Sequence, residues 1–480
     1  MALIDDVRTL VAATEKKTVE LAKEIWEYAE LPFDEYKSAA ALIAALKEEG
    51  FSVEEGVAEM PTCFVASYSV GSGKPKIGML AEYDALSALS QEAGCPVKKP
   101  VVNGAPGHGC GHNLLGAGCY SAAVAIKNYL VQNNKDGTIY FFGCPAEEGA
   151  GSKQFMARSG VFDDVDFIYS WHPSTKNGIS ATCSVAIMGA NFIFDGIASH
   201  AGGSPHLGRS ALDACELMNV GCNYLREHCI DQARIHYAYS DCGGTAPNVV
   251  QAHACIKYEV RAPKVKQMQE LFARVVNVAK GAALMTDTKL TVEITMAFSD
   301  YVPNTALAEI ANESFMELGA PEWSEEDYAL ARALLNSYDE TTADAIRDEF
   351  IEEYGEESLA EIMEKPLDRS IERFEKSKMA YECGSTDVGD VGYVTPTVTL
   401  HTATACLGNV GHSWQNTAFS GSDLGMKGMM KAAEVMTLAS LKAMDRPEVI
   451  QRAKAEVAKR NGGKYVCPLP DDVKPPVGRY

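Results

Sequence analysis

The sequence has no segment that reads as an export signal or as a membrane span. Its N-terminus, MALIDDVRTL, has neither a basic stretch nor a long apolar core. No apolar run approaches the roughly 18 residues that a spanning helix needs. The 14 cysteines are scattered, without the spacing of a disulfide framework. These absences predict a cytoplasmic protein with no membrane role, in which most cysteines are small buried side chains.

Positive charge is also in short supply, and two common catalytic motifs are missing. Lys and Arg number 43 against 65 Asp and Glu, which gives a formal net charge of −22. Such a surface repels phosphate backbones, so we expect no nucleic-acid partner. The chain contains no Gly-x-Ser-x-Gly, so a serine nucleophile elbow is unsupported. The stretch GSGKP at 71–75 lacks the spacing and the final Ser or Thr of a phosphate-binding P-loop.

What the sequence does contain is the pattern of an α/β protein. A length of 480 residues predicts two or more domains. Three apolar stretches, KIGMLAEYDAL, GTIYFFGCPAEEG and DFIYSWHP, read as buried strands that alternate with helices, which predicts a mixed, mainly parallel sheet flanked by helices. Each ends in carboxylates or a histidine. Because ligands bind beyond the carboxyl ends of parallel strands, we expect a site there.

A second texture covers residues 187–299. Strand-like and helical segments there suggest the order β-α-β-β-α-β, which is typical of a small ferredoxin-like α+β domain. We therefore predict that this domain is inserted into a catalytic domain formed by residues 1–186 and 300–480. Within the second part, residues 321–376 are acidic and helical and carry no obvious site chemistry, so we expect a solvated helical excursion.

The residues that carry chemistry fall into four separate stretches. They are Cys110 and His112 in GHGCGHNLLGAG, the pair Glu147 and Glu148, His172 in WHP, and His412 in GHSWQ. Thiolate, imidazole and carboxylate are the ligands of zinc and similar divalent ions. A Glu-Glu pair can bind metal through one carboxylate while the other acts as a general base.

Other interpretations of the same residues stay open at this point. The glycine-rich loop could hold a merely buried thiol, and His172 before a proline could be structural. Cys110 beside a histidine could also act as a nucleophile. Chelation separates these possibilities, because a metal enzyme loses activity on chelation and a thiol enzyme does not.

The motifs taken together resemble the M20 metallopeptidase family. GHGCGHN, PAEEGAGSK, WHP, SHAGGSP, GGTAPNVV with YEVR, and GSTDVGDV with GHSWQ occur in the order of that family over roughly residues 15–445. Within the family they are similar to the amidohydrolase branch that cleaves N-acyl amino acids. The resemblance implies hydrolysis of p-aminobenzoyl-glutamate to p-aminobenzoate and glutamate. Indole-acetyl or benzoyl conjugates are the alternative substrates.

The resemblance also implies roles for individual residues. Two divalent ions, zinc or manganese, would be bound by Cys110, His112, Glu148, His172 and His412, with the cysteine bridging them. Glu147 would be the general base, and Asp84 would orient a ligand. Many relatives have Asp-x-Asp where this chain has Glu82-Tyr83-Asp84, so the role of Glu82 is open. His108 has no role in the family, and we interpret it as a loop residue at the edge of the site.

The small domain would act as a lid and as a dimerisation surface. His200 would reach into a partner's site and stabilise the oxyanion there. Asn248 and Arg261 would hold the carboxylate of the substrate. The resemblance thus implies a homodimer or an assembly with a homologous second subunit. In the second case this chain could be a non-enzymatic half, although every expected site residue is present.

Overall fold

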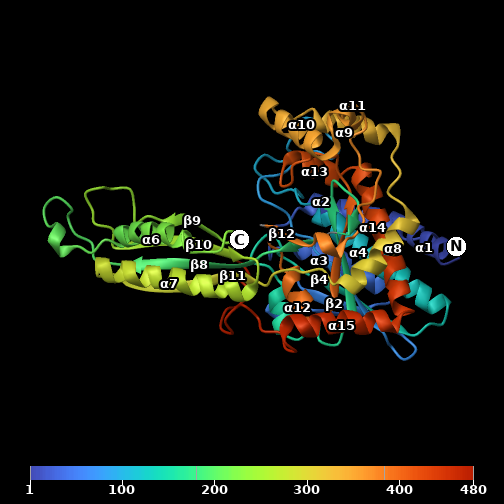
Figure 1. Cartoon of the computed structure of the whole chain (residues 1–480), viewed down its shortest axis with the longest axis horizontal. Helices are drawn as coiled ribbons and strands as arrows, with labels where there is room; N and C mark the ends of the chain where they lie inside the picture. Colours follow the sequence, from blue (N-terminus) through green and yellow to red (C-terminus); the bar gives the residue numbers. More distant parts are fainter. Residues whose placement is uncertain (1, 180, 383, 479–480) are drawn as a thin grey trace.

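A seven-stranded sheet forms the centre of the larger part of the molecule (Figure 1). The computed structural model describes residues 2–179, 181–382 and 384–478. The strand order is β1-β2-β4-β3-β5-β13-β6. The strands are β1 (Ser52–Glu55), β2 (Phe64–Val70), β3 (Lys76–Ala81), β4 (Gly137–Gly143), β5 (Phe167–Ser174), β6 (Gly178–Ile179) and β13 (Thr397–Ala403). The four central strands are parallel and the outer ones antiparallel, which confirms the predicted mixed, mainly parallel sheet.

Helices cover both faces of this sheet. On β3, Met79 packs into one hydrophobic cluster with α4 (His112–Gln132) and α14 (Asp423–Met444), whereas Leu80 packs into another with α5 (Lys153–Arg158) and α12 (Val388–Val394). Since both faces are buried, the strand reads as a continuous apolar run. The remaining helices around the sheet are α1 (Ala2–Ala12), α2 (Glu15–Tyr28), α3 (Tyr36–Glu48), α8 (Thr305–Leu318), α13 (Trp414–Ser420) and α15 (Pro447–Asn461).

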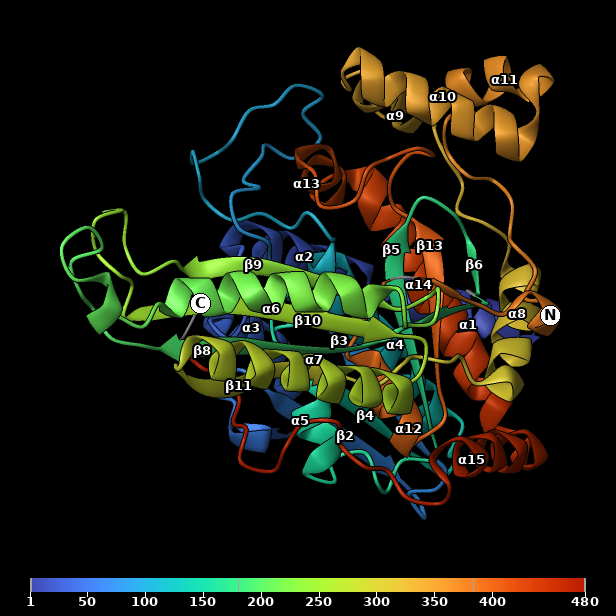
Figure 2. The same ribbon diagram turned by 60° about the vertical axis from the view of Figure 1, so that its left-hand side comes forward.

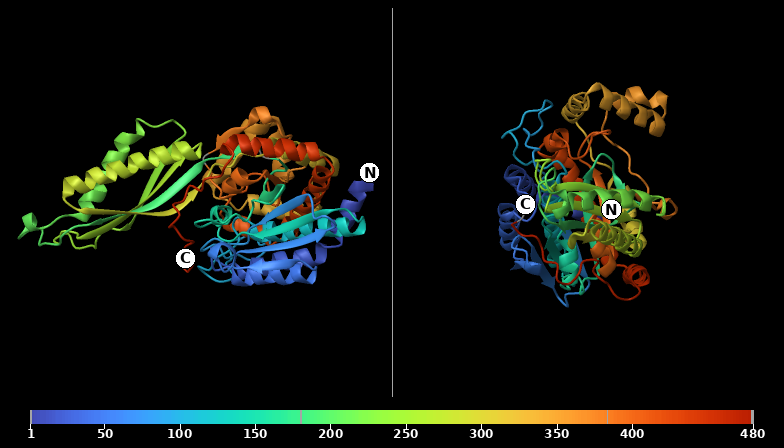
Figure 3. Two further views of the ribbon diagram at one scale, coloured as in Figure 1. Left: turned by 90° about the horizontal axis from the view of Figure 1, so that it is seen from below. Right: turned by 90° about the vertical axis from the view of Figure 1, so that its left-hand side faces the viewer.

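A four-stranded antiparallel sheet projects from one end of the molecule with two helices on one face (Figures 1 and 3). Its order is β11-β8-β10-β9. The elements are β8 (Ala186–Asp195), α6 (Ala211–Arg226), β9 (Arg234–Asp241), β10 (His253–Ala262), α7 (Val265–Thr286) and β11 (Lys289–Phe298). This is the predicted ferredoxin-like order, although the sequence pattern did not single out β9. Most β9 side chains are exposed, so the strand lacks a clear apolar alternation.

The segment 321–376 forms a compact helical unit that stands apart from the seven-stranded sheet (Figure 2). It contains α9 (Glu325–Leu335), α10 (Glu340–Tyr354) and α11 (Leu359–Glu364). Its apolar side chains, among them Leu334 and Phe350, share a hydrophobic cluster with Ala418 and Phe419 of α13. The excursion is therefore helical, as predicted, but it packs against the part of the chain that carries His412.

The short elements complete the chain. A two-stranded parallel sheet joins β7 (Thr182–Ser184) and β12 (Ala380–Glu382). Single turns of 3-10 helix occupy Val57–Glu59, Pro205–Leu207, Glu356–Ser358 and Lys376–Lys378. The 13 cysteines in the described ranges are all free thiols, in agreement with the absence of a disulfide framework, and Cys383 lies outside those ranges.

Helix α4 corrects the expectation that no apolar segment approaches the length of a membrane span. Among the described residues it is the one helix long and apolar enough to cross a membrane by length and composition. However, 89% of its apolar window is buried inside the protein. The sequence expectation failed because it searched for an unbroken apolar run, whereas small and weakly polar residues in α4 also bury completely.

Asp390 on α12 joins the end of the four-stranded sheet to the C-terminal segment. Its carboxylate accepts hydrogen bonds from the Ser299 backbone N–H (3.0 Å), the Ser299 hydroxyl (2.6 Å) and the Tyr465 hydroxyl (2.9 Å). Burial nevertheless raises its pKa to about 7. The folded state thus binds this proton more tightly than the unfolded state, and the resulting stability is lost as pH rises from about 4 through 7.

We expect Asp390→Asn to change the pH dependence of stability. The free energy of unfolding of the wild type should fall relative to that of the variant, by up to about 4 kcal/mol between pH 4 and pH 8. Urea unfolding across that pH range measures the difference. Asp163→Asn, at an exposed position, is the matched control. A constant difference between Asp390→Asn and wild type at all pH values would contradict the assignment.

Candidate metal centre

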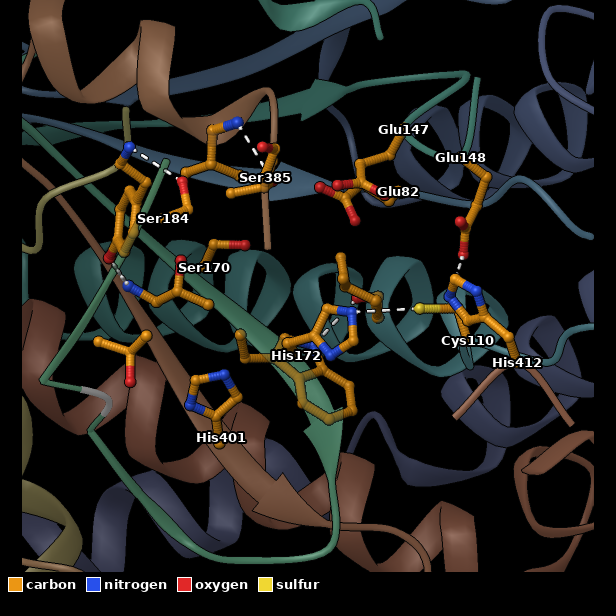
Figure 4. Close-up of a pocket in the computed structure, with 17 residues that line it drawn as sticks. Glu82, Cys110, Glu147, Glu148, Ser170, His172, Ser184, Ser385, His401 and His412 are labelled. Carbon is orange, nitrogen blue, oxygen red and sulfur yellow. Dashed lines mark hydrogen bonds and ion pairs between the residues drawn. The ribbon is translucent and has the colours of Figure 1, made fainter. Parts of the chain in front are cut away.

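Thiol, imidazole and carboxylate side chains converge at the carboxyl ends of the central parallel strands. They line one side of a cavity of about 340 Å³ (Figure 4). Glu82 follows β3, Glu147 and Glu148 follow β4, and His172 lies near the end of β5. Cys110 comes from the loop before α4, and His412 from the loop before α13. The structure therefore brings together residues that the sequence predicts as a single site, from five separate stretches of the chain.

The glycine-rich loop holds Cys110 close to its neighbours because it has almost no side-chain bulk. Gly111 adopts a left-handed φ of 85° immediately before α4, a conformation that other residues disfavour. A side chain at Gly107 would lie 2.2 Å from the carbonyl oxygen of Leu89. The loop is thus pressed against neighbouring backbone, and α4 begins at His112.

Cys110 is common to two groups of possible metal ligands. One contains Cys110, His112 and His172, and the other contains Cys110, Glu148 and His412; within each group the ligand atoms lie within 4.8 Å of one another. Cys110 Sγ is 3.4 Å from His172 Nε2, and His412 Nε2 is 3.4 Å from Glu148 Oε1. A thiolate shared by two such groups has the arrangement of a bridging ligand.

The unsatisfied atoms of the site fit metal binding. His112 Nε2 and Glu148 Oε1 are buried, and neither makes a well-formed hydrogen bond to a described residue. Buried polar atoms are rarely left in this state without a ligand. The opposite ring nitrogens are occupied: His112 Nδ1 is 2.8 Å from Asp84, and His172 Nδ1 donates to the Pro173 carbonyl oxygen at 2.7 Å. These contacts leave both Nε2 atoms directed at the cavity.

The turn after β4 is held from two sides. Asp84 Oδ2 accepts the backbone N–H of Glu148 at 2.8 Å, so one carboxylate orients both His112 and this turn. Glu35, which is fully buried, accepts the backbone N–H of Ala146 at 2.8 Å. Ala146 has a left-handed φ of 62°, which is unfavourable for alanine and persists only where the surroundings enforce it. The sequence analysis missed Glu35, because nothing in LPFDEY marks it as buried.

A buried lysine lies behind the site. Lys153 Nζ is 2.6 Å from Glu82 Oε1 and 2.6 Å from Asp387 Oδ1, and all three side chains are at most 4% exposed. The other oxygen of Glu82 is 3.3 Å from His112 Nε2. Lys153 therefore fixes the position of Glu82 at the edge of the cavity. It also answers what Glu82 contacts, which the sequence left open.

The two neighbouring glutamates differ in their electrostatic surroundings. Burial, followed by the nearby charge of Glu82, raises the pKa of Glu147 well above its usual value. Burial also acts on Glu148, but His412 and His112 outweigh it and lower the pKa of Glu148 to about 2. Glu148 therefore stays ionised at neutral pH, whereas Glu147 holds a proton readily. This is the asymmetry that the paired sequence motif predicts.

His108 lies outside the centre. Its Nε2 is 2.9 Å from the Ile25 carbonyl oxygen, and burial lowers its pKa to about 3. The ring is fully buried and is absent from every ligand group among the described residues. We conclude that His108 anchors the loop to α2, and the expectation that it reaches the site edge is not supported.

The three predicted lid residues do not reach this cavity. His200 accepts the backbone N–H groups of Gly202 and Gly203, and it bridges to Val249 in a loop beyond the far end of β8. Asn248 is in the adjoining exposed loop. Arg261 lies near the other end of β10, opposite Ile187. None of the three lines the cavity in the described part of the chain, because their sheet projects away from it.

Comparison with known proteins gives the site a context. The model of the peptidase family M20/M25/M40 matches residues 78–405. The p-aminobenzoyl-glutamate hydrolase of Escherichia coli has two different subunits, and the chain is similar to both. It is 39% identical over 476 residues to one of them, covering 98% of both chains. It is 30% identical over 237 residues to the other, covering 47% of this chain and 53% of that one.

A solved structure shows the same fold. The dinuclear metal-binding peptidase of the M20 family from Bacillus subtilis superimposes with a TM-score of 0.56 and 16% sequence identity. The match covers 90% of this chain and 99% of the other. The catalytic sheet and the projecting four-stranded sheet are therefore shared architecture.

Proposed function

Because this chain belongs to the peptidase family M20/M25/M40, we propose that it is a metal-dependent amidohydrolase that cleaves p-aminobenzoyl-glutamate to p-aminobenzoate and glutamate. The observation that carries the proposal is the cluster around Cys110, in which two ligand groups share one thiol and a separate carboxylate, Glu147, faces the same cavity. Identity of 39% over nearly the whole length supports the choice of substrate.

The ligand atoms fit two divalent ions, for which we propose zinc or manganese. Cys110 would bridge them, His112 and His172 would complete one site, and Glu148 and His412 the other. Bound divalent ions would polarise the scissile carbonyl and make water more acidic. Asp84 holds the His112 ring through Nδ1, and this contact raises the basicity of the coordinating nitrogen.

Glu147 is the proposed general base. It takes a proton from the attacking water, and its raised pKa allows it to keep that proton until the amide bond breaks. It then delivers the proton to the nitrogen of the departing amino acid. Burial of Glu147 in the cavity wall excludes bulk water from this transfer.

Residues 187–299 are the proposed lid and dimerisation domain. His200 would stabilise the oxyanion in a partner's cavity, and Asn248 and Arg261 would hold the substrate carboxylate. The partner is a second copy of this chain or a homologous second subunit, and the similarity to both subunits of the Escherichia coli hydrolase supports the latter. We place the protein in the cytoplasm, where its free thiols stay reduced.

The test is turnover by the purified chain, alone and mixed with a homologous subunit. The metal-loaded protein should release aminobenzoate from p-aminobenzoyl-glutamate, lose activity on chelation and regain it with Zn²⁺ or Mn²⁺. A panel of benzoyl, indole-acetyl and N-acetyl amino acids ranks the acyl groups. Equal rates on simple N-acetyl amino acids would overturn the aromatic preference, and activity that ignores chelation would indicate a Cys110 nucleophile instead.

Tyr338 links the helical excursion to the loop of His412. Its hydroxyl accepts the Val410 backbone N–H at 2.8 Å and donates to Asn409 Oδ1 at 3.2 Å. His412 has a left-handed φ of 53°, so this loop needs support from its surroundings.

We expect Tyr338→Phe to weaken metal binding by about 10-fold, because the loop that presents His412 loses an anchor. Competition with a fluorescent chelator measures the dissociation constant, and thermal unfolding monitors the fold. Tyr328→Phe, inside the hydrophobic cluster of the same excursion, is the control and should bind metal normally. Equal metal affinity in the two variants would contradict a role for Tyr338 in positioning His412.

A further inference from the structure

The cavity has two ends with different chemistry. The metal end carries the thiol, imidazole and carboxylate groups described above. The opposite end is lined mainly by hydroxyl groups and one imidazole, and we call it the hydroxyl compartment; it comprises Ser170, Ser184, Tyr301, Ser385, Thr399 and His401. Among the described residues that line the cavity there is no Lys or Arg, and the carboxylates are confined to the metal end (Figure 4).

Two neighbouring parallel strands build the floor of this compartment. Ser170 on β5 is paired with Thr399 on β13, and His172 is paired with His401. Since side chains alternate along a strand, these four residues lie on the same face of the sheet. The rings of His172 and His401 are 6.3 Å apart, a distance similar to the length of a benzene ring with a para substituent. A group that starts beside His172 therefore extends directly toward His401.

The hydroxyl groups are already held in place by backbone contacts. Ser170 donates its hydroxyl hydrogen to the Leu80 carbonyl oxygen at 3.2 Å, and Ser385 donates to the Val185 carbonyl oxygen at 2.9 Å. Their lone pairs stay available as acceptors. No described residue makes a hydrogen bond to either ring nitrogen of His401. The compartment is thus a preorganised wall rich in acceptors.

The other wall is fixed in the same way. The Tyr301 hydroxyl accepts the Thr399 backbone N–H at 2.9 Å, and the Tyr301 backbone N–H donates to Ser184 Oγ at 3.0 Å. Val388 adds an apolar contact beside these groups. A flat ring can therefore pack between the strands and this wall while a polar group at its tip meets oxygen and nitrogen atoms.

We propose that the hydroxyl compartment is the subsite for the acyl group, and that it selects an uncharged aryl group with a hydrogen-bond donor at its far end, such as an arylamine. The proposal rests on the proposed function, because it assumes that the amide bond lies at the metal end. A carboxylate in the compartment would be desolvated with no cation beside it, so the amino-acid half of the substrate belongs on the other side. An acetyl group is too short to reach His401.

The test compares p-aminobenzoyl-glutamate with benzoyl-glutamate, which lacks only the amino group. The wild type should prefer the amino substrate in kcat/KM, and Ser170→Ala, Ser385→Ala and His401→Leu should each reduce that preference by about 3- to 10-fold. His401→Gln, which restores polar atoms, should recover part of it. Metal content is measured for each variant, because His401 is next to His172.

Ser67→Ala on β2, outside the cavity, is the control and should keep the wild-type preference. An unchanged preference in all three cavity variants, with turnover intact, overturns the subsite and leaves the proposed function standing. If no N-acyl glutamate is hydrolysed, the function fails instead. The subsite is then judged by calorimetry with p-aminobenzoate and benzoate: equal affinity of the metal-loaded wild type for the two overturns it, and tighter aminobenzoate binding that the variants lose supports it.

Discussion

Glu147→Gln is expected to lower kcat on p-aminobenzoyl-glutamate by about 1,000-fold, because the amide cannot accept a proton from water. Gln keeps the size of Glu147, so the cavity and the ligand groups around Cys110 should persist. KM should change little, since the variant removes an interaction needed for the chemical step. Steady-state kinetics on the metal-loaded protein measures both constants, and elemental analysis confirms that the metal content is unchanged.

The matched control is Glu92→Gln, at a position outside the cavity where the carboxylate pairs with exposed Lys99. It should retain wild-type kcat. Loss of metal in Glu147→Gln would indicate that this residue is a ligand, and Glu148 would then become the candidate base. Turnover within a few-fold of wild type would show that neither assignment explains the proton transfer.

Cys110→Ala should remove the bridge between the two ligand groups and is expected to have the largest effect on metal content. Each group keeps only two of its three members, so affinity for divalent ions should fall by at least about 100-fold. Activity should disappear with the metal. Titration of the metal-free protein with Zn²⁺ or Mn²⁺, followed by calorimetry, measures the loss.

Cys110→Ser refines this result, because a hydroxyl of similar size is a weaker ligand than a thiolate. It should bind metal better than the alanine variant and worse than wild type. Cys242→Ala, at an exposed position in the projecting sheet, controls for the loss of a thiol and should behave as wild type. Normal metal content in Cys110→Ala, with activity lost, would support the nucleophile interpretation.

The sequence predicted the catalytic sheet well because its buried strands carry their own markers. β3, β4 and β5 are continuous apolar stretches that stop at Glu82, at the Glu147 pair and near His172. The rule that such ends share one edge of a parallel sheet then places the polar residues together. His412 was predicted through the family resemblance, since its loop has no strand before it.

Other parts of the site depend on contacts that leave no local pattern. Lys153 opens the short helix α5 and reads like any surface lysine, yet it is fully buried between two carboxylates. Tyr338 belongs to an acidic segment whose composition suggests only exposure to solvent. His401 sits among threonines on β13, and only the register with β5 brings it opposite His172. Sequence distance conceals each of these contacts.

The pairing of β5 with β13 has a consequence for how this enzyme could diversify. Along both strands, the residue nearest the carboxyl end faces the reaction centre, and the residue two positions earlier faces only the acyl compartment. Exchanges at Ser170 or Thr399 can therefore alter which acyl group is accepted without displacing a single ligand. New substrate preferences could arise from a conserved reaction by changes confined to one row of the sheet.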